Sequence, residues 1–475
     1  MRRALAEKRV AERPPLAHAA SSRTVANRAA AVRIGVAKST KADTAGATEA
    51  ALRQLASKLG GAVPDVVVVA VCGGDPGRPS PYDLGECLAR LREGPRALGR
   101  ETKVLATTSA FGVAVESQWV GGAAIALMGI CDPEGSYEVV YSEAPSPDVV
   151  RERVAAAAAR SGRTEPPAVS IVLTTHGTET TCLAGIQAAL GEDAHLVGGS
   201  CSLANPPGVA ASPGGGERDA CAPTGVALLL CWPTAVCASA FVSGAGPKPG
   251  ADDGAARRAS LAPGAAASPK AAASAGVITS LSRPEEGGLI VKTIDHRPAS
   301  EVWRSWLDAE DAAALAPWVD DPANQPPLAS APAFAHSATN PMGIERSEGV
   351  VMVCVMGIDG GELQFPPGVD VEEGEVLFPQ HVDRATICSK THEAAKRVCA
   401  KQSVGTDDIR GAFTFSCAIN AILGGDEGMQ DVSDKMACAL GSAPLFGITG
   451  GPELGHAYGS TASFACVMYS CLVFQ

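Results

Sequence analysis

The first half of the chain carries the same pattern of apolar segments twice. A β-branched run after Pro64 is matched 103 positions later by a run after Pro167, and the apolar segments beginning at Gly122 and Gly225 keep the same offset. Continuous apolar runs of this length are typical of strands buried on both faces. The repetition predicts a duplicated strand–helix–strand–strand unit that forms one α/β domain over residues 31–245.

Helical segments and short strands fill the space between these apolar runs. Helices are expected at 84–92 and 181–190, which share the tripeptide Cys-Leu-Ala, and a further helix is expected at 45–59. In each copy the following short strand runs into small residues. In the second copy these residues are Gly198, Gly199, Ser200 and Cys201.

Small residues at the end of a strand allow bare backbone amides and hydroxyls to approach an anionic or carboxylate group, so this segment is a candidate ligand-binding site. A tight turn that requires glycine torsions is the structural alternative. Just past the preceding core strand lie His176 and Glu179. One histidine with one glutamate is weak evidence for metal or acid–base chemistry.

The uncharged run from Gly225 to Val242 is near the lower limit of length for a membrane span. Trp232, Pro233 and Thr234 interrupt this run, so we interpret it as two buried strands joined by a turn and expect no membrane insertion.

The composition changes sharply after this run. Residues 246–275 are rich in Pro, Gly, Ala and Ser and are expected to form a linker or loop. Residues 276–475 recover an alternating pattern and predict a second, mixed-sheet α/β domain. Its strands are expected near 288–294, 350–356, 362–365, 411–417 and 463–474, and its helices near 299–309, 391–401 and 432–440.

Charge separates the first residues from the rest of the chain. The net charge is −12, which argues against a nucleic-acid partner, yet the first 40 residues hold nine Lys or Arg and two acidic residues. Residues 1–30 are therefore interpreted as a basic disordered tail or a transit peptide. A cytoplasmic location is expected, with a plastid or mitochondrion as the alternative if the segment is a transit peptide.

The 15 cysteines include no Cys-x-x-Cys pair, and most lie in apolar runs. Reduced, buried thiols are the expected state, and no metal site is predicted. No Walker loop or dinucleotide fingerprint is present, so the sequence identifies no cofactor. Cys417 ends the apolar run 411–417, where it is either packing material or a nucleophile.

Several motifs together resemble the paired FIST N-terminal and FIST C-terminal domains. In chain order they are the opening 34–40, the strand ending at Val197-Gly-Gly-Ser200, the turn at 294–299, the run ending at Cys417, and the segment around Gly451-Pro452-Glu453. The resemblance spans the chain from about Arg33 to its end, except for the linker.

The resemblance implies a non-catalytic sensory protein that binds a small polar ligand, such as an amino acid, and signals to a protein partner. It also implies an alternative role as a substrate-recognition adaptor for a ubiquitin ligase, as in F-box relatives. A thiol enzyme that uses Cys417 is a further alternative. The family arginine that could bind a ligand carboxylate is replaced here by Asn420. The expected ligand-binding residues are Gly198, Gly199, Ser200, Cys201, Cys417, Asn420, Gly451 and Glu453.

Overall fold

The computed structural model describes residues 32–475 apart from several gaps. The gaps are residues 76, 94–97, 202–203, 216–217, 247–274, 285–287, 321–331, 347–348, 367–368, 370, 402–404, 442 and 457–461. The predicted N-terminal tail and nearly all of the predicted linker lie outside the described residues.

The described chain repeats one unit three times, in the order strand, helix, strand, helix, strand, strand. The first unit consists of β1 (Arg33–Ser39), α2 (Thr44–Lys58), β2 (Val66–Gly73), α3 (Leu84–Glu93), β3 (Lys103–Ser109) and β6 (Ala123–Cys131). The second consists of β7 (Ser136–Ser142), α4 (Pro147–Arg160), β8 (Val169–Thr174), α5 (Glu179–Leu190), β9 (Leu196–Ser200) and β12 (Val226–Trp232). The third consists of β13 (Cys237–Ser243), α11 (Arg384–Lys401), β22 (Gly411–Cys417), α12 (Ala418–Leu440), β23 (Leu445–Gly450) and β26 (Met468–Phe474), with a short 3-10 helix at Thr406–Asp408.

All three units pair their strands in the same way. The first strand lies antiparallel to the last, the last lies antiparallel to the second, and the second lies parallel to the third. The predicted duplication is therefore confirmed, together with the α/β fold class. The third copy, which closes the chain, was not expected from the sequence.

Each unit also contains a β-hairpin that pairs with the sheet of another unit. The hairpins are β4 (Gly112–Val115) with β5 (Gln118–Gly121), β10 (Val209–Ser212) with β11 (Ala220–Ala222), and β24 (Glu453–Gly455) with β25 (Ser463–Ala465). β4 pairs with β23, β10 pairs with β3, and β24 pairs with β9, so the exchange is cyclic. Three six-stranded sheets result.

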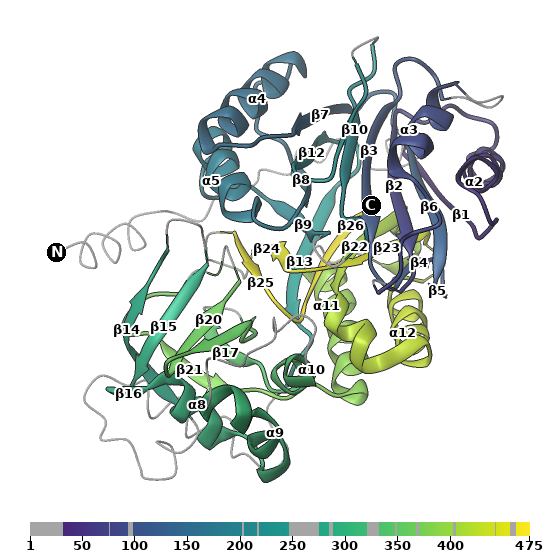
Figure 1. The fold of residues 1–475 in the computed structure, drawn as a ribbon. Coiled ribbons are helices and arrows are strands. Elements are labelled where there is room, and N and C mark those ends of the chain that lie inside the picture. The colour runs from purple at the N-terminus through teal and green to yellow at the C-terminus, as the bar shows by residue number, and fades with distance from the viewer. Residues whose placement is uncertain are drawn as a thin grey trace.

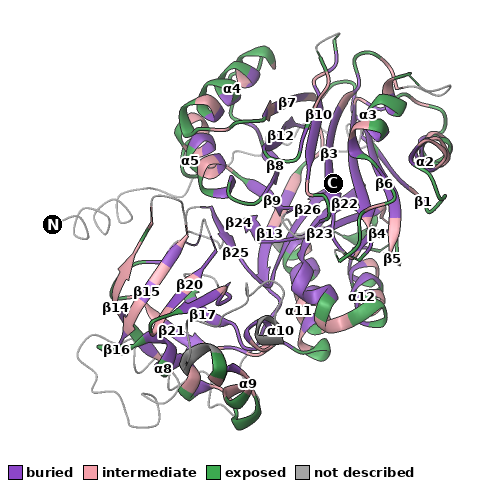
Figure 2. Cartoon of the chain, viewed as in Figure 1, coloured by how far each residue is buried: buried purple, intermediate pink, exposed green. Residues whose placement is uncertain are grey.

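The inner faces of the three sheets enclose one central apolar core, which includes Val68, Ile171 and Phe413. The outer face of each sheet packs on its own pair of helices: α2 with α3, α4 with α5, and α11 with α12 (Figure 1). Strands covered on both sides must be apolar at successive positions, which explains the continuous runs (Figure 2). The C-terminal strand β26 lies within this arrangement.

A fourth lobe, which we call the insertion lobe, is inserted between β13 and α11 of the third unit. Its strands are β14 (Gly276–Ser282), β15 (Leu289–Ile294), β16 (Arg297–Pro298), β17 (Met342–Arg346), β18 (Gly349–Val353), β19 (Gly357–Asp359), β20 (Glu362–Phe365) and β21 (Val376–Pro379). Its helices are α8 (Ala299–Trp306), α9 (Ala309–Asp320) and α10 (Pro332–Thr339). Gly246 and His381 exchange two backbone hydrogen bonds of 3.0 and 2.8 Å where the chain enters and leaves the lobe.

Several predicted elements differ from the structure in their partners or ends. The run 225–242 forms two strands as expected, but β12 and β13 belong to different sheets. The strand expected at 463–474 is divided into β25 and β26, which also lie in different sheets. The helix expected at 432–440 is the second half of α12, which bends at Gly425, where φ is 58°.

The two predicted domains are interleaved in space. β4 and β5 precede residue 245 but extend the sheet of the third unit, whereas β24 and β25 follow that residue and extend the sheet of the second unit. β13 likewise pairs with β26. Long-range strand pairing therefore determines the layers of the molecule, and sequence position does not.

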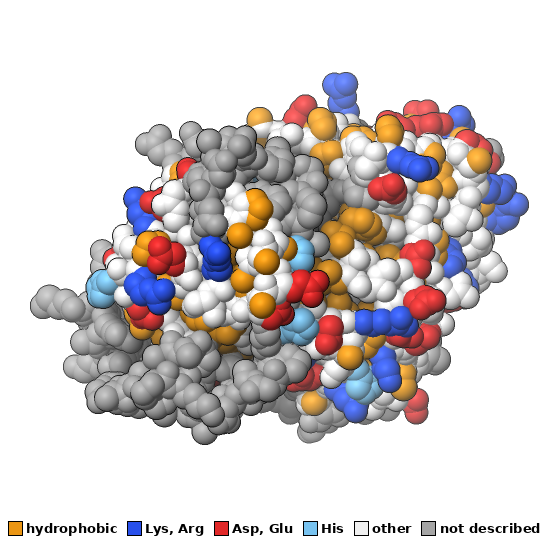
Figure 3. Space-filling view, turned by 60° about the horizontal axis from the view of Figure 1, so that its bottom comes forward, with side chains coloured by type: hydrophobic (Ala, Val, Ile, Leu, Met, Phe, Trp, Pro, Cys, Tyr) orange, Lys and Arg blue, Asp and Glu red, His pale blue; other side chains and the backbone are white. Residues whose placement is uncertain are grey.

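On the face shown in Figure 3, basic and acidic side chains of the described residues are interspersed. No helix within the described ranges has the length and apolarity needed to span a bilayer. None of the fifteen cysteines, which all lie in the described residues, forms a disulfide; most are buried, which confirms that they pack in the core, and their redox state stays a prediction.

Candidate functional site

The second and third units meet where parallel strands end. Here Glu453 of β24 pairs with Gly199 of β9. Past the ends of these strands, the Ser200 N–H donates a 3.0 Å hydrogen bond to the Pro452 carbonyl, and the Gly451 N–H donates a 2.7 Å hydrogen bond to the Ser200 carbonyl. Two segments that the sequence places 250 residues apart are thus one backbone network, which we call the β9–β24 junction.

The two glycines of β9 serve close packing. Gly198 has a φ of +138°, and a Cβ there would lie 1.9 Å from the Val172 carbonyl oxygen. A Cβ at Gly199 would lie 2.4 Å from the Phe415 ring. The Gly198 N–H donates to the Ser470 hydroxyl at 3.2 Å, and the Ser200 N–H is also engaged. These amides are not free for a ligand, contrary to the expectation of bare backbone donors.

A buried polar group, which we call the Glu453 cluster, lies beside this junction and comprises Cys354, Cys417, Asn420, Glu453 and Cys466. Glu453 is fully buried, and its Oε2 accepts a 3.0 Å hydrogen bond from the Met468 N–H. Burial raises the pKa of Glu453 well above its usual range, and the Cys466 thiol adds to the rise. The Met468 N–H and the Cys417 thiol oppose it.

The other members of the Glu453 cluster come from separate parts of the fold. Asn420 lies in the first turn of α12, and a Cβ placed on Gly244 would lie 3.3 Å from its Oδ1. Cys354 follows β18 of the insertion lobe, and its thiol hydrogen-bonds the Cys466 thiol. The Cys466 N–H donates to the Met352 carbonyl at 3.0 Å. The cluster therefore joins the insertion lobe to the three-unit body.

Cys417 lacks the surroundings of an activated nucleophile. It is 3% exposed, and burial raises the pKa of its thiol well above the usual value, with the nearby Glu453 carboxyl adding to the rise. Reactive cysteines instead lie in electropositive, accessible surroundings that lower the thiol pKa.

A second buried group, which we call the Glu179 cluster, comprises Thr174, Glu179 and Ser200. Thr174 and Ser200 are register partners at the ends of the parallel strands β8 and β9, and Glu179 is the first residue of α5. All three are fully buried. Burial raises the pKa of Glu179, while its own backbone N–H, His176 and the Ser200 hydroxyl act in the opposite direction.

The two clusters hold half of the unsatisfied buried side-chain atoms in the described structure, seven of fourteen. The buried atoms here without a hydrogen-bonding partner of normal geometry are Thr174 Oγ1, both Glu179 carboxyl oxygens, Ser200 Oγ, Glu453 Oε1 and both amide atoms of Asn420. An unsatisfied buried group costs about 1–3 kcal/mol, so native proteins keep few of them. Their concentration at one junction makes it the candidate site.

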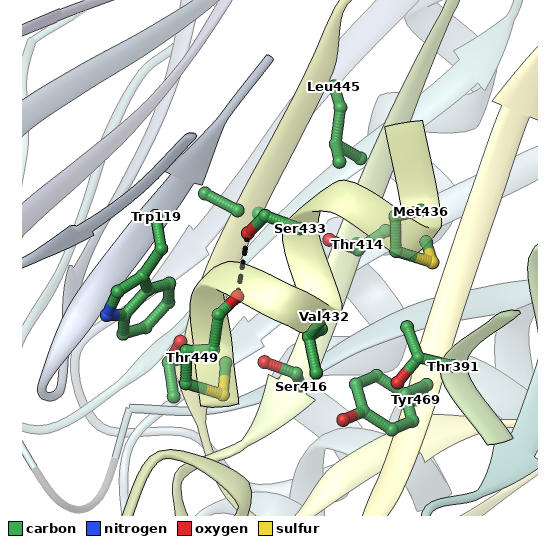
Figure 4. A pocket seen from close by; sticks show the side chains of 13 residues that line it. Trp119, Thr391, Thr414, Ser416, Val432, Ser433, Met436, Leu445, Thr449 and Tyr469 are labelled. Atoms are coloured by element: carbon green, nitrogen blue, oxygen red, sulfur yellow. Dashed lines mark hydrogen bonds between the residues drawn. The ribbon is translucent and has the colours of Figure 1, made fainter. Parts of the chain in front are cut away.

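A small cavity of about 20 Å³ lies between α12 and the outer face of the sheet formed by β22, β23 and β26 (Figure 4). Hydroxyl groups of Thr391, Thr414, Ser416, Thr449 and Tyr469 line it, together with the apolar side chains of α12. A cavity of this size holds about one water molecule.

The structure brings together most of the residues predicted from the sequence. Gly198, Gly199, Ser200, Gly451 and Glu453 share the junction, and Cys417 lies beside Glu453. Asn420 lies in the first turn of the helix that follows Cys417. Cys201 differs, because its thiol lies in the central core and donates to the Gly208 carbonyl at 3.3 Å. The sequence did not single out Thr174, Cys354 or Cys466, because only the fold places them here.

In the ranges that the structure describes, no three His, Cys, Asp or Glu side chains are arranged to hold a metal ion.

Comparison with protein families identifies part of the chain. Residues 299–456 match the FIST C domain. This region runs from α8 through β24 and includes Cys354, Cys417, Asn420 and Glu453. The FIST C domain is in general a sensory, ligand-binding domain. The match does not extend to residues 31–245, so the resemblance of that segment to the FIST N domain stays a prediction.

No curated protein matches the chain. Among solved structures, one of cyanuric acid hydrolase aligns with a TM-score of 0.37 and 7% identity over 94% of this chain and 100% of that one. Another, of cyanuric acid hydrolase from A. caulinodans, aligns with a TM-score of 0.27 and 11% identity over 45% of this chain and 72% of that one. Both similarities are too weak to bear on the chemistry of this chain.

Proposed function

We propose that this protein is a non-catalytic sensor that binds a small polar ligand at the β9–β24 junction and signals its presence to a protein partner. The observation that carries the proposal is the gathering of unsatisfied buried polar atoms in the Glu453 and Glu179 clusters. The match of residues 299–456 to a ligand-sensing domain supports the same role.

The insertion lobe provides a route from the site to the surface. Cys354 and the Met352 carbonyl of this lobe contact Cys466, which follows β25 of the exchanged hairpin. A ligand that binds one arrangement of these contacts more tightly shifts the population toward it. The lobe would thereby present a different surface to a partner when the ligand is bound.

Two alternatives from the sequence have less support. The adaptor role finds no support in the family match, which covers the FIST C domain alone. The thiol-enzyme role is disfavoured by the raised pKa of Cys417. The free thiols fit a reducing compartment such as the cytoplasm.

Asn420→Leu separates ligand binding from folding. Leucine has a similar size, and both polar atoms of Asn420 are buried without partners, so the variant should be at least as stable as the wild type. Ligand-induced stabilisation should be lost in the variant.

The assay is thermal unfolding against a panel of amino acids and other polar metabolites, accompanied by mass spectrometry of compounds that copurify with the full chain. At least one compound should raise the melting temperature of the wild type in a concentration-dependent way. The exposed substitution Glu192→Gln is the matched control and should respond as the wild type does. A panel without any response, and no copurifying compound, would refute the proposal.

A further inference from the structure

The Glu179 cluster has an arrangement that specifies the charge of its ligand. Thr174 and Ser200 face the same side of the sheet as register partners, at the carboxyl ends of two parallel strands. Glu179 opens α5 directly beyond these ends. Ligands of α/β proteins bind at this edge of a sheet, because the loops and helix starts converge there.

The buried oxygens of this cluster have only imperfect partners: the N–H groups of Glu179 and Gly177 and the Ser200 hydroxyl approach the Glu179 carboxyl and lower its pKa. Glu179 Oε1 and Oε2, Ser200 Oγ and Thr174 Oγ1 make no hydrogen bond of normal geometry with the described residues. The His176 ring is the ionisable side chain paired with Glu179, and its Nδ1 lies 3.8 Å from Oε1, beyond hydrogen-bonding distance. Within the described part of the chain, no Lys or Arg side chain pairs with Glu179.

The pattern of donors and acceptors favours a cation. A carboxylate accepts but does not donate, and each hydroxyl supplies a further acceptor position. A primary ammonium group carries three N–H donors, which equals the number of side chains in the cluster. With an anionic ligand the Glu179 carboxyl would have to stay protonated, whereas an ammonium group supplies the counter-charge that a buried carboxylate needs.

The surroundings of Glu179 provide an entrance. The side chain of His176 is 66% exposed, whereas that of Glu179 is fully buried 3.8 Å away, so the loop between β8 and α5 separates the cluster from solvent. Gly177 in this loop has a φ of 83°, and a Cβ there would meet no atom within 4 Å. On either side of the exposed His176 and Gly177, Thr175 and Thr178 are buried and hydrogen-bond the Gly225 carbonyl, so entry of a ligand requires these contacts to open.

We propose that the Glu179 cluster binds the primary ammonium group of an organic amine, with Glu179 as its counter-charge and with Thr174 and Ser200 as hydrogen-bond acceptors. The inference rests on the proposed sensory function and names the ligand class of its site. The loop that carries His176 admits the ligand. Binding ionises the Glu179 carboxyl, whose proton leaves to solvent.

Titration calorimetry with n-butylammonium chloride tests the inference on the full chain. Tetramethylammonium chloride, which has the charge without N–H donors, and sodium butyrate, which has the opposite charge, serve as comparison ligands at equal ionic strength. The wild type should bind butylammonium at least tenfold more tightly than either. Titrations in two buffers of different ionisation enthalpy at neutral pH should show proton release.

Glu179→Gln is close to isosteric with the protonated acid and should reduce butylammonium affinity at least tenfold and abolish proton release. Thr174→Val keeps the shape of the side chain, removes one acceptor and should cause a smaller loss of affinity. Glu192→Gln lies just past the end of the same helix, is exposed and should leave both quantities unchanged.

The outcomes separate this inference from the proposed function. Unchanged butylammonium affinity in Glu179→Gln, or preference for butyrate or tetramethylammonium, would overturn the amine assignment. If a compound without an amine stabilises the wild type and fails to stabilise Asn420→Leu, the sensory function stands and the amine assignment falls. If no compound of any class binds, both fall.

Discussion

Replacing Glu453 by Gln should change how the stability of the protein depends on pH. The carboxyl group is fully buried, Oε2 accepts one hydrogen bond from the Met468 N–H, and Oε1 makes no hydrogen bond of normal geometry in the described structure. A glutamine keeps the shape and the acceptor for Met468 but cannot ionise. The variant therefore isolates the cost of ionising this one group.

The sign follows from the raised pKa of Glu453. In the unfolded chain the group ionises near pH 4.5, whereas the folded state holds the proton to higher pH because burial penalises the charge. Between these values the folded state binds more protons than the unfolded state, so stability falls as pH rises. Within that window the wild type should lose about 1.4 kcal/mol per pH unit relative to Glu453→Gln.

The assay is urea unfolding at pH 5, 6 and 7, followed by tryptophan fluorescence. The free-energy difference between Glu453→Gln and the wild type should grow in favour of the variant over this range. Glu192→Gln, an exposed carboxylate, should run parallel to the wild type. Parallel curves for Glu453→Gln and the wild type would show that Glu453 ionises normally, and the reasoning about its burial would be wrong.

Three further outcomes test the packing and the thiol chemistry. Gly198→Ala should prevent folding, because its Cβ would lie 1.9 Å from a backbone oxygen. Gly177→Ala has open space around it and should cost about 1–2 kcal/mol. Equal urea midpoints for the two variants would contradict this expectation. Iodoacetamide should label the exposed Cys438 at least tenfold faster than the buried Cys417, as measured by peptide mass spectrometry. Comparable labelling rates would support the hypothesis that Cys417 is a nucleophile. Asp132→Asn should destabilise the protein by about 2–4 kcal/mol in urea, because the buried carboxylate accepts three hydrogen bonds, and an unchanged midpoint would mean that these bonds contribute nothing.

Local pattern was sufficient to predict most strands and the duplication. Strands β20 and β22 have the predicted ends, and Val66 and Val169 open β2 and β8 with the predicted offset of 103 residues. Runs of β-branched residues covered on both faces leave little ambiguity. The copies in the first half also have similar lengths, which made their repetition visible in the sequence.

The third copy was missed because the insertion lobe interrupts it. Its first strand, β13, and its first helix, α11, are separated by the residues of that lobe, so no constant offset links the third copy to the others. The exchanged hairpins also pair with strands that are distant in the sequence, and hydrophobic periodicity does not predict such pairing. Thr174 and Cys354 were missed for this reason, whereas Glu453 was found through its glycine-rich surroundings.

The three exchanged hairpins allow a comparison that explains why Glu453 is unusual. At equivalent positions, where each hairpin begins to pair with its neighbour, Val113 faces Ile448, Val209 faces Thr107, and Glu453 faces Gly199. All three hairpin residues are buried, so packing alone favours valine. A carboxyl group at one of the three equivalent positions departs from this preference for valine, and such departures are expected at residues kept for function.

The comparison is testable at Val209. Val209→Glu should lower the free energy of unfolding at pH 7 by about 3 kcal/mol from protonation alone. The new carboxyl is ionised in the unfolded chain but must be protonated when it is buried in the folded state. Val209→Thr keeps the shape and buries only a neutral hydroxyl, whose cost of about 1–3 kcal/mol does not depend on pH. Urea midpoints of the two variants measure the difference. If Val209→Glu were as stable as Val209→Thr, these junctions would tolerate a carboxyl group anywhere, and Glu453 would need no functional explanation.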